Sequence, residues 1–228
     1  MHKIRSAIFD LDGTLLNTLS DLAHSTNYAL KINGFPEHPI EAYRYFVGNG
    51  ISKLFERALP ENEKTEENVM RIRKTFLPYY DEHNTDFTKP YEGIPELLIK
   101  LQSKGIILAV ASNKYQAATE KLISIFLPDI SFSAVLGQRE GIPVKPDPAI
   151  IYSILEITNI PPSETVYIGD SGIDMQTAIN GGVISIGVTW GFRTREELKT
   201  AGANYIANTT AEILNILNLN YSFKETTF

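Results

Sequence analysis

The amino-acid sequence predicts an α/β protein whose parallel β-sheet is covered by helices on both faces, with a helical segment inserted after the first strand. From Tyr91 onward, short continuous apolar runs alternate with amphipathic helical patterns, which is typical of such a sheet. An apolar run near the N-terminus, Ile4–Phe9, stops at the turn-forming sequence Asp-Leu-Asp-Gly and predicts one more buried strand. The long stretch between these regions carries helical patterns but no comparable strand. We therefore predict a core formed by residues 1–17 and 87–228, and an all-helical cap formed by residues 18–86.

The inserted segment contains three helical patterns separated by turn signals. The patterns cover Leu15–Leu30, Ile51–Leu59 and Glu66–Tyr80. Glycine and proline interrupt the helical period at Gly34-Phe-Pro36 and Gly48-Asn-Gly50. Three helices joined by turns are therefore expected here.

The second part of the core alternates between helices and strands. Leu97, Leu98 and Leu101 form a helical stripe that Gly105 ends, and the continuous apolar run Ile106–Ala111 predicts a strand. Further elements are strands at Val166–Ile168 and Ile184–Val188, a helix opened by Asp147-Pro148, and two helices opened by the capping boxes of Thr194 with Glu197 and Thr209 with Glu212. The polar sequence from Asn218 onward is expected to be a frayed end.

Composition and charge narrow the class of protein and of partner. The 228 residues are 43% hydrophobic and 21% charged, as in an ordinary globular protein, and they include no cysteine, which excludes disulfides, thiolate metal ligands and a cysteine nucleophile. A net charge of −6 without a basic stripe argues against a nucleic-acid partner. No stretch approaches the roughly 20 apolar residues of a membrane span. We expect a cytoplasmic monomer or homodimer that acts on a small molecule, with neither nucleic acid nor membrane as a partner.

Polar side chains follow the predicted strands where the chain leaves the sheet. The first strand is followed by Asp10, Asp12 and Thr14, the second by Ser112, Asn113 and Lys114, and a later one by Asp170 and Asp174, with Lys145 between the last two groups. The carboxyl ends of parallel strands meet at one edge, where open α/β sheets bind ligands, so these side chains are expected to converge. Carboxylates brought together in this way repel one another unless a cation neutralises them.

This set of residues suits phosphoryl transfer assisted by a magnesium ion. Mg²⁺ prefers oxygen ligands, and Asp10 and Asp170 are the carboxylates expected to hold it. Residues i and i+2 of an extended segment point the same way, so Asp10 and Asp12 are predicted to face one site. One of them can then attack phosphorus while the other gives a proton to the leaving oxygen. Ser112 would hydrogen-bond a phosphoryl oxygen, and Lys145 would supply a fixed positive charge.

Each of these residues also has a purely structural interpretation. Ser112 and Asp170 could cap helices, Asp174 could complete a capping box begun by Ser171, and Lys145 could be a solvated loop lysine. Such matches are common by chance when they are taken one at a time. Their joint occurrence at the few strand ends favours the functional interpretation.

Four motifs carry a resemblance to a known family. They are, in chain order, Asp10-Leu-Asp-Gly-Thr14, Ala111-Ser-Asn-Lys114, Lys145-Pro-Asp-Pro148 and Gly169-Asp-Ser-Gly-Ile-Asp174. In residues and order they resemble the haloacid dehalogenase superfamily, over most of the chain. The phrases Phe46-Val-Gly-Asn-Gly50 and Gly187-Val-Thr-Trp-Gly-Phe192 resemble its phosphoglycolate-phosphatase-like branch. One departure is Asn180-Gly181-Gly182, where relatives usually place an alanine before a single glycine, and this difference concerns helix packing rather than chemistry.

The resemblance implies a Rossmann-like core with a small helical cap that closes over the site. It implies that Asp10 is the nucleophile and a metal ligand. Asp12 would be the general acid and base, and its main-chain carbonyl would complete the metal shell. The implied activity is Mg²⁺-dependent hydrolysis of a small phosphorylated metabolite, with 2-phosphoglycolate as the leading candidate, through an aspartyl-phosphate intermediate.

The resemblance also implies roles for the other motif residues. Ser112 and Asn113 would bind the phosphate, and Lys145 would balance its charge. Asp170 would ligate Mg²⁺, and Asp174 would support that metal shell.

Several other activities share part of this pattern. A haloacid dehalogenase would have no need of Asp12 or of a metal. A β-phosphoglucomutase-like phosphotransferase has matching catalytic residues, but its usual cap sequence is not the one around Phe46–Gly50, and a pyrophosphatase of the same superfamily stays open. From a different class, a non-catalytic phospho-acceptor or binding module such as a receiver domain also gathers carboxylates and Mg²⁺ at a sheet edge. A receiver domain is, however, roughly half this length and has no inserted helical segment.

Recognition of the leaving group falls to the predicted cap. A substrate carboxylate would need a donor there, and Arg44, Lys53 and Arg57 flank the Gly48-Asn-Gly50 turn. The backbone N–H groups of that turn could also cradle an anion. A solvated basic face explains each of the three cations equally well.

Overall fold

The computed structural model describes residues 3–217 and contains a six-stranded sheet in the order β5-β4-β1-β6-β7-β8. The strands are β1 (Ser6–Phe9), β4 (Ile107–Tyr115), β5 (Phe132–Gln138), β6 (Thr165–Gly169), β7 (Ile184–Val188) and β8 (Tyr205–Ala207). Every neighbouring pair runs parallel. The central strands β1 and β6 are buried along their whole length, which explains why their sequences are continuously apolar or small.

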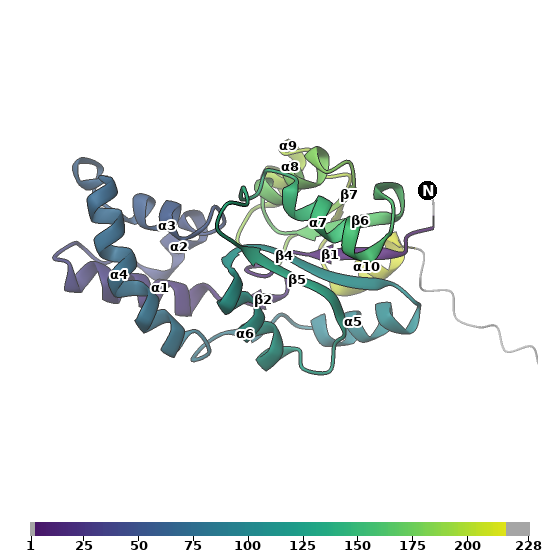
Figure 1. The fold of residues 1–228 in the computed structure, drawn as a ribbon, viewed down its shortest axis with the longest axis horizontal. Helices are drawn as coiled ribbons and strands as arrows, with labels where there is room; N and C mark the ends of the chain where they lie inside the picture. Colours follow the sequence, from purple (N-terminus) through teal and green to yellow (C-terminus); the bar gives the residue numbers. More distant parts are fainter. Residues whose placement is uncertain (1–2, 218–228) are drawn as a thin grey trace, which may run out of the picture.

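Helices cover both faces of this sheet (Figure 1). They are α5 (Ile94–Ser103), α6 (Gln116–Phe126), α7 (Ala149–Thr158), α8 (Gly172–Asn180), α9 (Arg195–Thr200) and α10 (Thr210–Ile216), with the short 3-10 helix η3 (Pro162–Glu164) before β6. Ala7 and Phe9 of β1 belong to the apolar cluster that α5 and α10 complete on one face. Ile8 points the opposite way and packs in the cluster of Ile151 from α7 and Ala178 from α8. The predicted α/β class is confirmed.

The remaining helices form a separate group beside the sheet (Figure 1). They are α1 (Leu19–Ile32), α2 (Tyr43–Phe46), α3 (Ile51–Ala58) and α4 (Glu66–His83), with the 3-10 helices η1 (Ile40–Ala42) and η2 (Glu61–Glu63). They share an apolar cluster, which Ala118 of α6 and Phe192 also join, and in which Leu22, Phe55 and Phe76 are almost completely buried. Figure 1 places this group at the left, at the end of the sheet away from the N-terminus.

A pair of short antiparallel strands joins the helical group to the sheet. Leu16 and Asn17 form β2, which pairs with Lys89 and Pro90 of β3. The carboxylate of Asp21, at the start of α1, accepts hydrogen bonds from the backbone N–H groups of residues 87 and 88, at 3.0 and 2.8 Å. The chain therefore leaves the core and returns to it at one place.

Some elements differ from the sequence prediction. The helix predicted over Leu15–Leu30 begins at Leu19, because the N–H groups of Leu15 and Leu16 bond back to the carbonyl of Leu11 in a tight turn. Strands β5 and β8, helix α6 and the β2–β3 pair were not predicted. Strands β5 and β8 lie at the two edges of the sheet, where part of each strand is solvent-exposed and the sequence need not be continuously apolar.

Two late helices begin where the sequence predicts. The side chains of Thr194 and Thr209 accept the N–H groups of Glu197 and Glu212, as in the first half of a capping box. The two glutamate carboxylates instead accept N–H groups of other residues. The expected frayed end from Asn218 lies outside the described residues. Within residues 3–217, no helix is both long and apolar enough to traverse a lipid bilayer.

Candidate active site

The predicted site residues gather at the carboxyl ends of three neighbouring strands. Asp10 directly follows β1, Asp170 directly follows β6, and Ser112 and Asn113 lie in the last part of β4. Because β1 lies between β4 and β6, these ends are adjacent. Lys145 enters from the segment between β5 and α7. The topology thus brings residues far apart in the sequence into one site.

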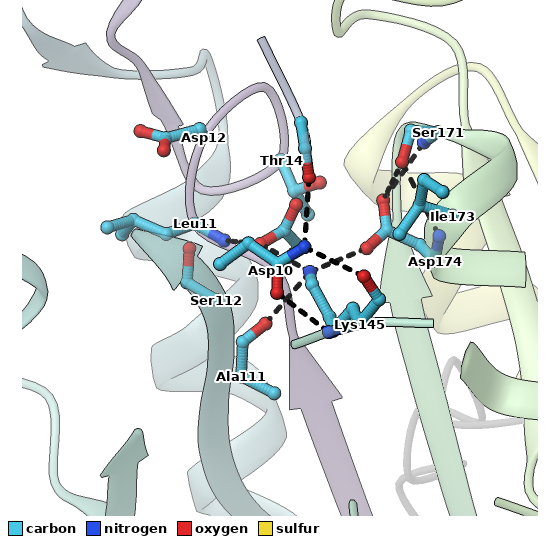
Figure 2. A network of polar contacts seen from close by, with 12 residues as sticks. Asp10, Leu11, Asp12, Thr14, Ala111, Ser112, Lys145, Ser171, Ile173 and Asp174 are labelled. Carbon is cyan, nitrogen blue, oxygen red and sulfur yellow. Dashed lines mark hydrogen bonds and ion pairs between the residues drawn. The ribbon is translucent and has the colours of Figure 1, made fainter. Parts of the chain in front are cut away.

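Lys145 lies at the centre of the site and is only 2% exposed (Figure 2). Its Nζ lies 2.9 Å from Asp10 Oδ1 and 2.7 Å from Asp174 Oδ1. It also donates to the Tyr167 hydroxyl, at 2.9 Å, and to the carbonyl of Ala111, at 3.1 Å. Burial alone would lower the pKa of Lys145, but the carboxylates of Asp10 and Asp174 raise it well above its usual range. Lys145 is therefore a buried cation and not a solvated loop lysine.

Tyr167 was missed by the sequence analysis. It lies in the middle of β6 and is fully buried. A buried tyrosine hydroxyl needs a polar partner, and this one contacts Lys145 and Ala111. A tyrosine inside an otherwise apolar strand, three residues before Asp170, is the signal that could have revealed it.

Asp174 combines a structural role with a position in the site. Its Oδ2 accepts the N–H and the hydroxyl of Ser171, at 3.0 and 2.7 Å, and closes a capping box at the start of α8. Its Oδ1 faces Lys145. A Cβ atom at Gly169 would lie 2.4 Å from the Asp174 side chain, so glycine is required there for this approach. The structural interpretation of Asp174 is thus correct, and one oxygen still faces the site.

Asp170 is buried between two backbone segments. Its Oδ2 accepts the N–H of Phe192 at 2.6 Å, and its Oδ1 accepts the Thr14 hydroxyl at 3.4 Å. A Cβ atom at Gly13 or Gly191 would lie 2.3 or 2.4 Å from the Asp170 side chain, so both segments need glycine at these positions in order to approach it this closely. Ser171, and not Asp170, caps α8. Likewise Ser112 lies within β4 and caps no helix.

Three carboxylates of the site can fit one metal ion. Ligand oxygens of Asp10, Asp170 and Asp174 all lie within 4.8 Å of one another, and the three residues are buried. Burial raises the pKa of Asp10 to about 7, and the negative charge of Asp174 adds to this increase, although the positive charge of Lys145 opposes it. Burial also raises the pKa of Asp170 well above its usual range, and the negative charges of Asp174 and Asp10 add to this increase. Buried carboxylates that repel one another in this way are a donor set suited to a hard divalent cation such as Mg²⁺.

Asp12 lies apart from this group (Figure 2). The chain turns after Asp10 instead of continuing as an extended strand, so the predicted i and i+2 geometry is wrong. Asp12 Oδ1 accepts the Thr18 hydroxyl at 2.6 Å and lies 3.1 Å from Lys114 Nζ. Asp10 and Asp12 nevertheless line the same cavity, and Leu11 between them is fully buried.

Asn113 holds two loops against the sheet. Its Oδ1 accepts the N–H of Lys145 at 2.8 Å, and its Nδ2 donates to the carbonyls of Lys145 and Gly48, both at 3.1 Å. The side-chain amide is therefore occupied by backbone groups. Ser112 lies beside it, and its Oγ accepts the N–H of Lys114 at 3.2 Å.

A cavity opens above these residues, between the sheet edge and the helical group. It has about 390 Å³ of empty volume with its open mouth included. Its floor includes Asp10, Asp12 and Ser112. The helical group contributes Leu22, Val47, Gly48, Gly50, Ile51 and Leu54, and β4 contributes Asn113 and Lys114. The part of the wall that comes from the helices is therefore apolar apart from backbone groups.

The three cations considered as donors to the substrate carboxylate lie outside this cavity. Arg44 pairs with Glu41 and donates to the carbonyl of Gly191. Lys53 pairs with Glu56 on the exposed side of α3. Arg57 donates to two carbonyls at the end of α2 and to an asparagine side chain in the loop before α3. None of the three lines the cavity.

Comparisons with known proteins agree with this architecture. A family model described as haloacid dehalogenase-like hydrolase matches residues 7–188. A Haemophilus influenzae protein named phosphoglycolate phosphatase is 33% identical over 215 residues, which cover 92% of this chain and 96% of the relative. A solved structure from Lactobacillus delbrueckii subsp. bulgaricus is 34% identical, with a TM-score of 0.90 over 94% of this chain and 98% of the other. A Haemophilus somnus structure, described as a predicted phosphoglycolate phosphatase, is 31% identical with a TM-score of 0.87, and the match covers 95% of this chain and 99% of the other.

Proposed function

The chain belongs to the haloacid dehalogenase-like hydrolase family and is a phosphoric monoester hydrolase, and we propose that it hydrolyses 2-phosphoglycolate through an acyl phosphate formed on Asp10. The observation that carries the proposal is the buried Asp10–Lys145 pair beside Asp170, with Asp10 itself lining the cavity. The relatives named phosphoglycolate phosphatase, which match almost the whole chain, support the substrate.

In the first step, a carboxylate oxygen of Asp10 attacks phosphorus and the bond from phosphorus to the ester oxygen breaks. The carboxyl group of Asp12 gives its proton to that oxygen, and glycolate leaves. Asp10 now carries the phosphoryl group. Ser112 and Lys145 lie at the same sheet edge, where a hydroxyl and an ammonium group stabilise the charge that spreads over the phosphoryl oxygens.

In the second step, the Asp12 carboxylate takes a proton from a water molecule, whose oxygen attacks phosphorus. The bond between phosphorus and the Asp10 oxygen breaks, inorganic phosphate leaves, and Asp10 regains its carboxylate. Asp12 thus ends the cycle protonated, as it began. The cavity that contains both carboxylates is the place where water and substrate would meet them.

The residues that would hold Mg²⁺ are Asp10, Asp170 and the main-chain carbonyl of Asp12, with Asp174 supporting the shell. When bound, the ion supplies the positive charge that lets a phosphate dianion approach a group of carboxylates. Asp174 is already engaged through both oxygens, by Ser171 and Lys145, so a supporting position suits it better than a direct one.

We further propose that residues 18–86 act as a cap that encloses the substrate. Their apolar contribution to the cavity wall, from Leu22, Val47, Ile51 and Leu54, would exclude water around the ester bond. Gly48 and Gly50 would let the backbone approach the substrate carboxylate closely.

A substrate panel tests the proposed substrate. We expect kcat/KM for 2-phosphoglycolate to exceed that for glycerol 2-phosphate, glucose 6-phosphate and pyrophosphate by roughly tenfold or more, because a pocket built around one leaving group discriminates by about that factor. The measurement is phosphate release with Mg²⁺ present. If a sugar phosphate or pyrophosphate is cleaved as well as 2-phosphoglycolate, the substrate is wrong and the phosphatase activity stands.

Asp12→Asn tests the proton-transfer role. The change removes the proton donor and keeps the main-chain carbonyl, so we expect a loss of about 10³-fold in kcat/KM, which reports the first step, on ethyl phosphate, whose alkoxide needs protonation. On p-nitrophenyl phosphate, whose phenolate needs little protonation, the loss should be about tenfold. Steady-state kinetics on the two substrates give the comparison. Equal losses would show that Asp12 does not act as the acid.

A further inference from the structure

Lys114 is a second buried lysine at the sheet edge, and the steps above leave it without a role. Its side chain is 3% exposed, and it lies on β4 two residues after Ser112. Its Nζ lies 3.1 Å from Asp12 Oδ1 and donates to the Tyr80 hydroxyl at 2.8 Å. The same Nζ lies 4.8 Å from the centre of the Tyr80 ring. A buried ammonium group needs such partners, and one of them is the proposed acid.

Tyr80 gives Lys114 a fixed support on helix α4. It is fully buried and stacks on Phe76, with ring centres 5.0 Å apart. The next residue, Asp81, accepts the Tyr115 hydroxyl through its carboxylate and Lys121 Nζ through its carbonyl. This end of α4, next to Tyr80, is thus attached to β4 and α6 by the side chains of Tyr115 and Lys121.

The two donors that reach the Asp12 carboxylate use the same oxygen. Lys114 Nζ and the Thr18 hydroxyl both contact Oδ1. Among residues 3–217, no donor contacts Asp12 Oδ2. The carboxyl group is therefore held at one oxygen, and the other is left for the oxygen of a leaving group or of water.

We propose that Lys114, supported by Tyr80, is a positioning residue that holds Asp12 Oδ1 so that Oδ2 exchanges the proton with the substrate. The proposal rests on the proposed function, since it requires Asp12 to be the acid. Lys114 also lines the cavity, where it could meet a substrate anion directly. Its ammonium group is already shared between Asp12 and Tyr80, and this favours positioning over substrate binding.

Two substitutions and a matched control test the proposal. Lys114→Met keeps the unbranched shape and most of the length of the side chain and removes its charge, and Tyr80→Phe removes the hydroxyl that supports it. We expect Lys114→Met to lower kcat/KM about 30-fold on ethyl phosphate and less than about threefold on p-nitrophenyl phosphate, because only the first substrate depends on a well-placed acid. Tyr80→Phe should change the ratio of kcat/KM on ethyl phosphate to kcat/KM on p-nitrophenyl phosphate in the same direction, by about threefold to tenfold. Tyr79 is the neighbouring residue and stacks on Tyr28. Tyr79→Phe is the control and should leave kcat/KM unchanged on both substrates.

A double substitution separates positioning from other roles. Because Lys114 acts through Asp12, Asp12→Asn with Lys114→Met should be no slower on ethyl phosphate than Asp12→Asn alone. Equal losses on both substrates, or additive losses in the double variant, would overturn the proposal. So would a raised KM for 2-phosphoglycolate with unchanged rates on ethyl phosphate, which would make Lys114 a substrate-binding residue. If Lys114→Met does not fold, Tyr80→Phe is compared with Tyr79→Phe instead. The proposal is then overturned if Tyr80→Phe leaves the ratio of kcat/KM on ethyl phosphate to that on p-nitrophenyl phosphate unchanged. The covalent mechanism is tested separately at Asp10, so either proposal can fail alone.

Discussion

Asp10→Asn is expected to lower kcat by at least about 10⁴-fold on every phosphate ester, because it removes the attacking oxygen on which the whole reaction depends. The substitution keeps the size and shape of the side chain. It also removes a carboxyl group whose pKa burial raises to about 7, and thereby removes repulsion with Asp174. Phosphate release and circular dichroism together give the test.

The fold should survive this change. The ion pair with Lys145 is lost, but Lys145 keeps Asp174, Tyr167 and the carbonyl of Ala111 as partners. We therefore expect a melting temperature no lower than that of the unchanged protein. Asp129→Asn, at an exposed position between α6 and β5, is the control and should retain full activity. Activity within tenfold of the unchanged protein in Asp10→Asn would contradict attack by Asp10.

Removal of divalent cations is expected to abolish turnover, and Mg²⁺ should restore it. The buried carboxylates of Asp10, Asp170 and Asp174 otherwise repel an incoming phosphate. Ca²⁺ should not restore activity, because its larger and looser shell would misplace the attacking oxygen. Phosphate release after EDTA treatment, and again after each ion is added back, gives the result.

Thermal unfolding provides a readout of Mg²⁺ that is independent of activity. An ion that binds only the folded chain stabilises it by about 2.7 kcal/mol at 100 times its dissociation constant. Mg²⁺ should therefore raise the melting temperature, and Asp170→Asn should reduce that increase. Full activity in a metal-free sample, or an equal thermal shift in Asp170→Asn, would contradict the proposed metal site.

The sequence predicted the central part of the fold better than its edges. Strands β6 and β7 lie where Val166–Ile168 and Ile184–Val188 were predicted, because strands buried on both faces leave continuous apolar runs. Strands β5 and β8 lie at the edges of the sheet, where exposed positions remain within each strand, and their short apolar stretches were not recognised as strands. The pattern of Leu15 and Leu16 matches a helix and a tight turn equally well, and only tertiary contacts decide between them.

The site was predicted in its residues more than in its geometry. Asp10 and Asp170 meet because the strand order places the ends of β1 and β6 side by side, whereas Lys145 reaches them from the segment after β5, where Asn113 holds its backbone. The turn after Asp10, which places Asp12 beside Lys114, depends on backbone contacts that side-chain alternation does not reveal. The roles of Tyr167 and Lys114 depend on partners that are distant in the sequence, and a single sequence shows no such pairing.

The short β2–β3 pair has a consequence for how proteins with this architecture can diversify. Because Leu16 and Asn17 pair directly with Lys89 and Pro90, the two chain segments that connect the helical group to the core lie side by side. A segment whose ends already touch can be lengthened, shortened or exchanged without altering the order of the strands. Evolution can therefore change the helical wall of the cavity while the carboxylates and the lysine of the site stay unchanged.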